Sequence, residues 1–98
     1  MMLKYYDKET KTLTIPYKFN KELKDIPEEI ETIFFGYYYN KSVDNLANNL
    51  THLTLLTFGK NFNQTVNNLP KNLTHLTFGY QTPVRLAHPK IMNIFIIV

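Results

Sequence analysis

The sequence contains no cysteine and no tryptophan, and Arg85 is its only arginine. Without cysteine the chain has no disulfide, no thiolate metal site and no cysteine nucleophile. It has no apolar run approaching the ~20 residues of a membrane span, and its first residues lack the apolar core of a signal peptide. These absences predict a soluble, cytoplasmic protein that does not contact membranes.

Charge is also scarce, since charged residues make up 19% of the 98 residues and the formal net charge is +3. Acidic residues such as Glu28, Glu29 and Glu31 lie among the lysines and prevent a continuous basic stripe. Because such a stripe supplies much of the free energy of nucleic-acid binding, we expect no nucleic-acid partner.

What the sequence does contain is a repeat. Residues 49–54 and 72–77 share the sequence Asn-Leu-Thr-His-Leu-Thr, and residues 57–59 and 77–79 share Thr-Phe-Gly. Weaker copies place Ile33, Phe35 and Gly36 in the same pattern, and Leu13, Ile15 and Pro16 before them. The unit is therefore 20 to 23 residues long.

A unit of this length holds one short strand and a return path too short for a long helix. The repeat therefore predicts a mainly β fold: a short leucine-rich-repeat-like solenoid with one parallel strand per repeat. Residues 1–98 form one domain in this interpretation. Its parts are an N-terminal β-hairpin cap with its cap strand and turn at 1–11, about four repeats at 12–84, and an irregular apolar cap or tail at 85–98. The hairpin pairs Leu3–Tyr6 with Lys11–Ile15.

Alternation along each strand predicts which side chains face the core. One inner column holds Ile15, Phe35, Phe58 and Phe78, and a second holds Phe19, Tyr39 and Phe62. Asn20, Asn40 and Asn63 follow in one phase, which indicates a buried asparagine ladder whose amides bond turn backbone groups. Gly79 is expected to turn the chain away from its strand.

One irregularity interrupts the pattern, because the copy that ends at Phe58 has three residues more after Leu53 than its successor. An odd insertion inverts the phase of a strand, so either Leu53 and Leu55 or Leu56 and Phe58 face inward. We therefore expect a bulge or small loop within Thr54–Leu56.

The outward positions of the strands form the best candidate site. Repeat proteins bind partners on such surfaces, and an exposed phenylalanine on a rigid sheet suits an anchor. The candidate binding residues are Phe34, His75, Thr77, Thr32 and Thr57, with Thr12 and Thr14 in the same columns. Alternatively, Phe34 packs under the N-terminal hairpin.

Catalytic and metal sites find little support. His52 and His75 share a phase in the repeat and are expected about 5–10 Å apart on neighbouring strands, but no third ligand shares it. No nucleophile has a base in phase, and no carboxylate pair recurs. We expect no enzyme activity, no metal and no cofactor.

Residues 69–79 and 58–64 closely resemble the FNIP repeat, a relative of the leucine-rich repeat that is abundant in social amoebae and giant DNA viruses of amoebae. The likeness covers about residues 12–84. It implies a protein–protein interaction module without known catalysis, whose partner is an unknown host or viral protein, in the host cytoplasm if the chain is viral. Some members carry an F-box that recruits a ubiquitin ligase, and residues 1–11 are too few for one.

Two alternatives remain: a truncated family member without independent activity, or a ubiquitin-ligase adaptor fragment that lacks its F-box. The apolar segment Ile91–Val98 bears on this choice. It is interpreted as a final strand over the last repeat, as a contact for self-association, or as an aggregation-prone end left by truncation.

Overall fold

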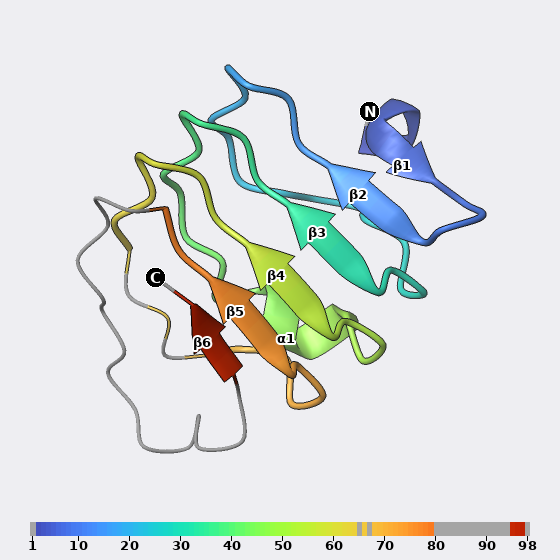
Figure 1. Cartoon of the computed structure of the whole chain (residues 1–98). Coiled ribbons are helices and arrows are strands. Elements are labelled where there is room, and N and C mark those ends of the chain that lie inside the picture. The colour runs from blue at the N-terminus through green and yellow to red at the C-terminus, as the bar shows by residue number, and fades with distance from the viewer. Residues whose placement is uncertain (1, 65, 67, 80–94, 98) are drawn as a thin grey trace.

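The computed structural model describes residues 2–64, 66, 68–79 and 95–97. In these residues six short strands form one sheet, in the order in which they occur along the chain (Figure 1). They are β1 (Tyr6–Asp7), β2 (Thr12–Thr14), β3 (Thr32–Phe34), β4 (Leu55–Thr57), β5 (His75–Thr77) and β6 (Phe95–Ile97). β1 is antiparallel to β2, and every later pair is parallel. The prediction of a mainly β fold is confirmed.

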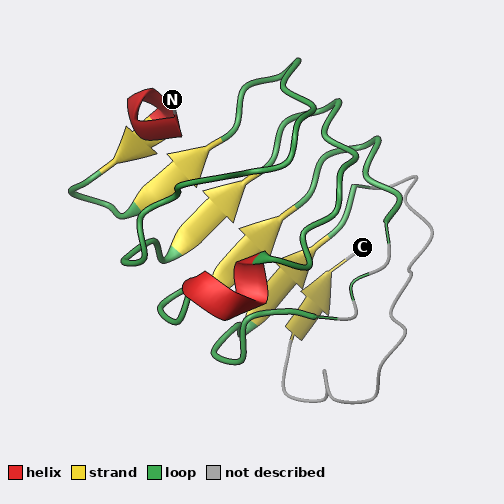
Figure 2. Cartoon of the chain, turned by 180° about the vertical axis from the view of Figure 1, so that it is seen from behind, coloured by secondary structure: helices red, strands yellow, loops and turns green. Residues whose placement is uncertain are grey.

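Parallel strands require a crossover, and each repeat supplies one as a return segment behind the sheet (Figure 2). The first residues of β2 to β6 are Thr12, Thr32, Leu55, His75 and Phe95, so successive strands start 20, 23, 20 and 20 residues apart. Each repeat thus contributes one strand and pairs with the strand of the next repeat.

The core lies between the inner face of the sheet and the return segments. The strands supply two inner columns: Leu13, Ile33, Leu56 and Leu76, then Ile15, Phe35, Phe58 and Phe78. The return segments supply the opposite wall: Leu23, Ile30, Tyr39, Val43, Leu46, Leu50, Leu53, Phe62, Val66 and Leu73. Burial of each large side chain stabilises the fold by about 1.5–3 kcal/mol.

The N-terminal hairpin is shorter than the sequence pattern predicts. Met2–Tyr5 forms a 3-10 helix rather than a strand, and only Tyr6–Asp7 pairs with β2. The Asp7 carboxylate oxygen accepts hydrogen bonds from the backbone N–H groups of Glu9 (2.9 Å) and Thr10 (3.4 Å), which makes a tight turn. Strand pairing stops there because this turn and the helix use the flanking residues.

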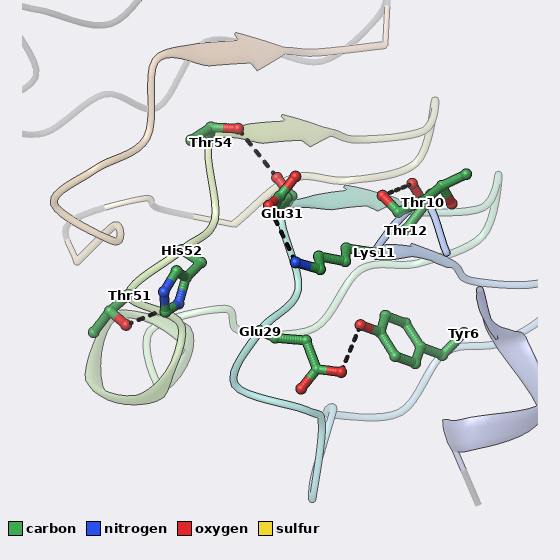
Figure 3. Close-up of polar contacts among 9 residues, drawn as sticks. All are labelled: Tyr6, Thr10, Lys11, Thr12, Glu29, Glu31, Thr51, His52 and Thr54. Atoms are coloured by element: carbon green, nitrogen blue, oxygen red, sulfur yellow. Dashed lines mark hydrogen bonds and ion pairs between the residues drawn. The ribbon is translucent and has the colours of Figure 1, made fainter. Parts of the chain in front are cut away.

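Tyr6 links the hairpin to the second repeat. Its hydroxyl donates to the Glu29 carboxylate at 2.9 Å (Figure 3). Burial, and then this hydrogen bond, raise the pKa of Tyr6 to about 12. The hairpin therefore extends the plane of the sheet beside β2 and is held to the return segment by a side-chain contact.

At the other end of the chain, β6 continues the repeat period in parallel with β5. A regular strand thus stands where the sequence pattern predicts an irregular tail. The final strand over the last repeat that the sequence analysis considered is thus present at Phe95–Ile97, paired with β5. The rest of the segments 85–98 and Ile91–Val98 lies outside the described residues.

The three-residue insertion lies in the return segment, and the predicted bulge at Thr54–Leu56 is wrong. Leu55–Thr57 is a regular strand in register with both neighbours. The extra residues fall between Leu46 and Leu53, which are seven apart where Leu69 and Leu73 are four apart. There α1 (Leu46–Asn49) forms one helical turn behind the sheet (Figures 1 and 2). A helix rises only about 1.5 Å per residue, so it takes up extra chain within a short distance.

The glycines after the strands permit close contact between repeats. None of their φ angles is positive, so no left-handed conformation requires glycine here. The carbonyls of Gly36 and Gly59 accept from the N–H groups of Tyr39 and Phe62 at 3.3 and 3.4 Å, so both glycines start a turn. The residues that would test the predicted turn after Gly79 lie outside the described residues. A Cβ on Gly79 would lie 2.7 Å from the Gly59 carbonyl oxygen. A Cβ on Gly59 would overlap the Gly36 carbonyl oxygen, and one on Gly36 would overlap the Pro16 carbonyl oxygen. Backbone therefore packs directly on backbone in this column.

The register of β4 predicts different costs for two adjacent leucines. Leu56→Ala should lower the free energy of unfolding by about 2–5 kcal/mol because Leu56 is fully buried. Leu55→Ala should lower it by less than about 1 kcal/mol because Leu55 is half-exposed on the outer face. Urea titration followed by circular dichroism measures both values. If Leu55→Ala were the more destabilising of the two, the insertion would lie within the strand and not in the return segment.

The glycine column predicts that Gly59→Ala lowers the free energy of unfolding by about 1–3 kcal/mol, because the added methyl forces two repeats apart. Asn61→Ala, an exposed position two residues later, is the matched control and should change it by less than about 0.5 kcal/mol. Equal values for the two variants would mean that the repeats tolerate separation at this column.

Candidate binding face

The outer face of the sheet carries two columns of side chains that are fixed by the strand register. One column is Thr12, Thr32, Leu55 and His75, and the other is Thr14, Phe34, Thr57 and Thr77. The structure therefore places all five predicted binding residues on one face. Leu55 joins them, and the sequence analysis missed it because it assigned this residue to the insertion. From β2 to β5 no residue of these columns is an Asp, Glu, Lys or Arg, and Asp7 of β1 stands opposite Thr12 at the end of the first column.

Phe34 is the largest apolar side chain in the two outer columns from β2 to β5. Its side chain is 41% exposed, and its neighbours in the column are Thr14 and Thr57. The alternative that Phe34 packs under the N-terminal hairpin does not hold, because β1 lies beside β2 in the sheet. Phe34 therefore stands between two short side chains on a backbone that is hydrogen-bonded on both sides.

A ladder of hydrogen bonds fixes the start of each strand. The backbone N–H groups of Glu31, Thr54 and Thr74 each donate at 2.9 Å to the carbonyl one repeat earlier, on Lys11, Glu31 and Thr54. The threonine hydroxyls repeat this pattern. Thr54 donates to the Glu31 carbonyl at 3.3 Å (Figure 3), and Thr74 donates to the Thr54 carbonyl at 3.1 Å. An exposed ion pair joins Lys11 to Glu31 at 3.9 Å (Figure 3). The edge of the face is thus held by main-chain contacts.

The two histidines do not share a column. The position that corresponds to His75 in the preceding strand is Leu55, and His52 lies three residues before β4. Each ring nitrogen Nδ1 lies near the hydroxyl of the threonine before it, at 3.4 Å for His52 and 3.0 Å for His75. The shared six-residue sequence misled the prediction, because the first copy, residues 49–54, lies three residues further from its strand than the second copy does. Among the described residues no three His, Asp or Glu side chains gather at metal-binding distance.

The asparagine ladder is present, but at the surface. The Asn20 Oδ1 accepts from the Asn40 backbone N–H and the Asn40 Oδ1 accepts from the Asn63 backbone N–H, both at 2.8 Å. Gln64 also donates to Asn40, at 3.2 Å to its carbonyl and 3.0 Å to its Oδ1. Asn20 and Asn63 are exposed and Asn40 is half-buried, so the prediction of burial is wrong. The side chains bond neighbouring turns from outside, where water satisfies their remaining groups.

The aromatic ladder lies inside the repeats. Phe35 and Phe58 stack with ring centroids 5.1 Å apart, and Phe58 and Phe78 with centroids 5.7 Å apart. Tyr39 stacks on Phe35 at 4.2 Å, and Phe62 stacks on Phe58 at 3.7 Å. Phe19, the predicted first member of the second column, is only half-buried. Two parallel rows of rings thus connect the repeats.

Tyr39 is fully buried in this ladder. Its hydroxyl donates to the Ser42 carbonyl at 3.3 Å, which is a weak hydrogen bond. Burial, with a smaller contribution from the negative charge of Glu22, raises the pKa of Tyr39 well above its usual value. Tyr39 is therefore neutral in the folded protein up to strongly alkaline pH.

A second group of aromatic residues lies on the surface of the turns. Tyr17, Tyr37 and Tyr38 contact one another with ring centroids 5.2–5.4 Å apart. The Lys60 ammonium lies 5.6 Å from the Tyr37 ring centroid. These three tyrosines come together only across two repeats. The 20-residue period from Tyr17 to Tyr37 is the signal that finds this contact.

Together, one strand per repeat and a largely uncharged outer face define a β repeat protein. A sequence model of the FNIP repeat matches residues 42–81, which include α1, β4 and β5. This part of the chain therefore carries FNIP repeat sequence. Searches of curated proteins and of solved structures each found no match. Neither helix in the described part of the chain is long and apolar enough to cross a membrane.

The raised pKa of Tyr39 predicts a loss of stability in alkali. An unfolded tyrosine ionises near pH 10, whereas folded Tyr39 keeps its proton, so the free energy of unfolding should fall as pH rises above about 10. Tyr39→Phe should fold and make this fall less steep. The control Tyr17→Phe, at an exposed tyrosine, should keep the wild-type profile. Urea titrations between pH 8 and pH 11.5 compare the three proteins, and identical slopes would show that Tyr39 ionises freely in the fold.

Proposed function

We propose that the chain is a non-catalytic protein–protein interaction module of the FNIP repeat type. In this proposal it is a short leucine-rich-repeat-like solenoid that binds a host or viral protein through the outer face of its sheet. The exposure of Phe34 at the middle of that face is the observation that carries the proposal.

Three properties of the face support this function. It is nearly free of charge, so a partner does not have to strip water from ions to contact it. Threonine predominates and is short, so Phe34 protrudes and suits the pocket of a partner. The strands behind it are hydrogen-bonded to two neighbours, so binding orders little of the backbone.

The chemistry of the described residues agrees with a binding role. From β2 to β5, His75 is the one ionisable side chain in the two outer columns, and its Nδ1 lies near the Thr74 hydroxyl. General acid–base or nucleophilic chemistry needs at least two such groups in mutual contact. The FNIP match over residues 42–81 points to the same class of function, because repeats of this kind present surfaces rather than catalytic pockets.

The proposal predicts that Phe34→Ala weakens partner binding about thirtyfold or more in Kd, the effect of removing a central aromatic anchor. Tyr38→Ala is a matched control, because Tyr38 is 42% exposed where Phe34 is 41% exposed, and it lies outside the outer columns. It should change Kd less than about threefold.

The partner is first identified with a photo-crosslinking amino acid at position 34, compared with the same group at Lys71 in a return segment. Kd is then measured with the purified partner by isothermal titration calorimetry. Both alanine variants must unfold cooperatively, as the wild type does. Equal effects of Phe34→Ala and Tyr38→Ala, or equal crosslinking from both positions, would count against the outer face as the binding site.

A further inference from the structure

A second surface lies away from the sheet, at the turns and return segments of the first two described repeats. A hollow of about 620 Å³ is lined there by Asn20, Lys21, Glu22, Lys24 and Lys41. Its size is within the range of ligand-binding clefts in proteins. Its charge is +2, three lysines less one glutamate, while the whole chain has +3. Positive charge is thus concentrated at this hollow.

Stacking of the repeats forces two of these charges together. Lys21 follows Asn20, and Lys41 follows Asn40 in the next repeat. The 2.8 Å hydrogen bond from the Asn40 backbone N–H to Asn20 Oδ1 joins the two turns directly before them. Neighbouring repeats are about 5 Å apart at the backbone, so the side chains of Lys21 and Lys41 start from adjacent positions and bring two like charges to one hollow.

The third repeat shows a neutral solution for this position. Gln64 stands where Lys21 and Lys41 stand in the earlier repeats, and its amide donates two hydrogen bonds back to Asn40. The lysines form no such bond. Within the part of the chain that the structure describes, none of Lys21, Lys24 and Lys41 lies within 4 Å of a carboxylate oxygen. The first two repeats therefore have lysines at the position where the third repeat has a glutamine that bonds its neighbour.

We propose that this hollow binds a carboxylate-rich peptide segment of a partner protein. Three ammonium groups from two repeats surround a space much larger than one phosphate group, so a chain with several carboxylates reaches all of them. Each lysine acts as a point charge on a flexible stem, which suits carboxylates spread along a peptide. This contact is separate from the outer face and adds a second, charge-based determinant to recognition.

The geometry favours an acidic peptide over single-stranded nucleic acid. Nucleic-acid binding of that kind needs open aromatic faces beside the cations. The nearby rings of Tyr17, Tyr37 and Tyr38 pack on one another and Lys60 lies over Tyr37, so each ring already has an aromatic partner, although Tyr17 and Tyr38 stay partly exposed. A neighbouring hollow of about 250 Å³ shares Lys24 and adds Asp25, so a negative charge stands next to the third lysine and the charge preference rests mainly on Lys21 and Lys41.

The test measures binding of fluorescein-labelled octaglutamate to the full chain by fluorescence anisotropy at about 50 mM salt. The double variant Lys21→Gln/Lys41→Gln introduces the residue that the third repeat already has, and should raise Kd at least about tenfold. The control Lys8→Gln/Lys71→Gln removes the same charge from exposed positions elsewhere and should change Kd less than about twofold. Lys24→Gln alone should weaken octaglutamate binding severalfold. It replaces the double variant in the test if the double variant does not unfold cooperatively.

Several outcomes would overturn the proposal. They are no saturable binding by the wild type, equal weakening by both double variants, or displacement of the probe by oligothymidylate or tripolyphosphate at lower concentration than by unlabelled octaglutamate. Phe34→Ala should leave octaglutamate binding unchanged. Failure of this site and failure of the outer face are therefore measured separately.

Discussion

Each repeat lies against the next at the distance of a backbone hydrogen bond, and the other features of the fold follow from this spacing. The strands are parallel and in register, so every side chain stands above the side chain of the same phase. At about 5 Å only some residues tolerate a copy of themselves. Aromatic rings stack, asparagine bonds the next backbone, and glycine leaves room for a carbonyl. Lys21 and Lys41 occupy the same position in successive repeats, where the next repeat has Gln64.

The same spacing explains where the chain accommodates its insertion. Three extra residues within β4 would break hydrogen bonds to β3 and β5 and displace Gly59 from its contact with Gly36. In the return segment they cost no strand pairing. They also bury one more leucine, Leu50, between Leu46 and Leu53. The fold therefore preserves the strand and lengthens the segment behind it.

The features that could be predicted from the sequence are those set by period and alternation. They include one strand per repeat, Phe35, Phe58 and Phe78 on the inner side, and Phe34 and Thr57 on the outer side. The position of β4 could not be predicted by similarity, because residues 49–54 match residues 72–77 while the strand uses residues 55–57. Sequence identity alone does not show that residues 55–57 gain hydrogen bonds to both β3 and β5, which places the strand there rather than at residues 52–54. The hollow was missed because its lysines come together only across repeats, in turns that carry no hydrophobic period.

The single turn α1 has a consequence for recognition. The longer repeat places its three extra residues in the return segment, at α1. The strands from β2 to β5 therefore keep one register although the repeats differ in length. The outer face therefore keeps an even spacing of side chains, which is set by the hydrogen bonds between the strands. Insertions in the return segments can change the surface behind the sheet without changing this spacing. The two sides of the molecule can therefore vary independently in sequence.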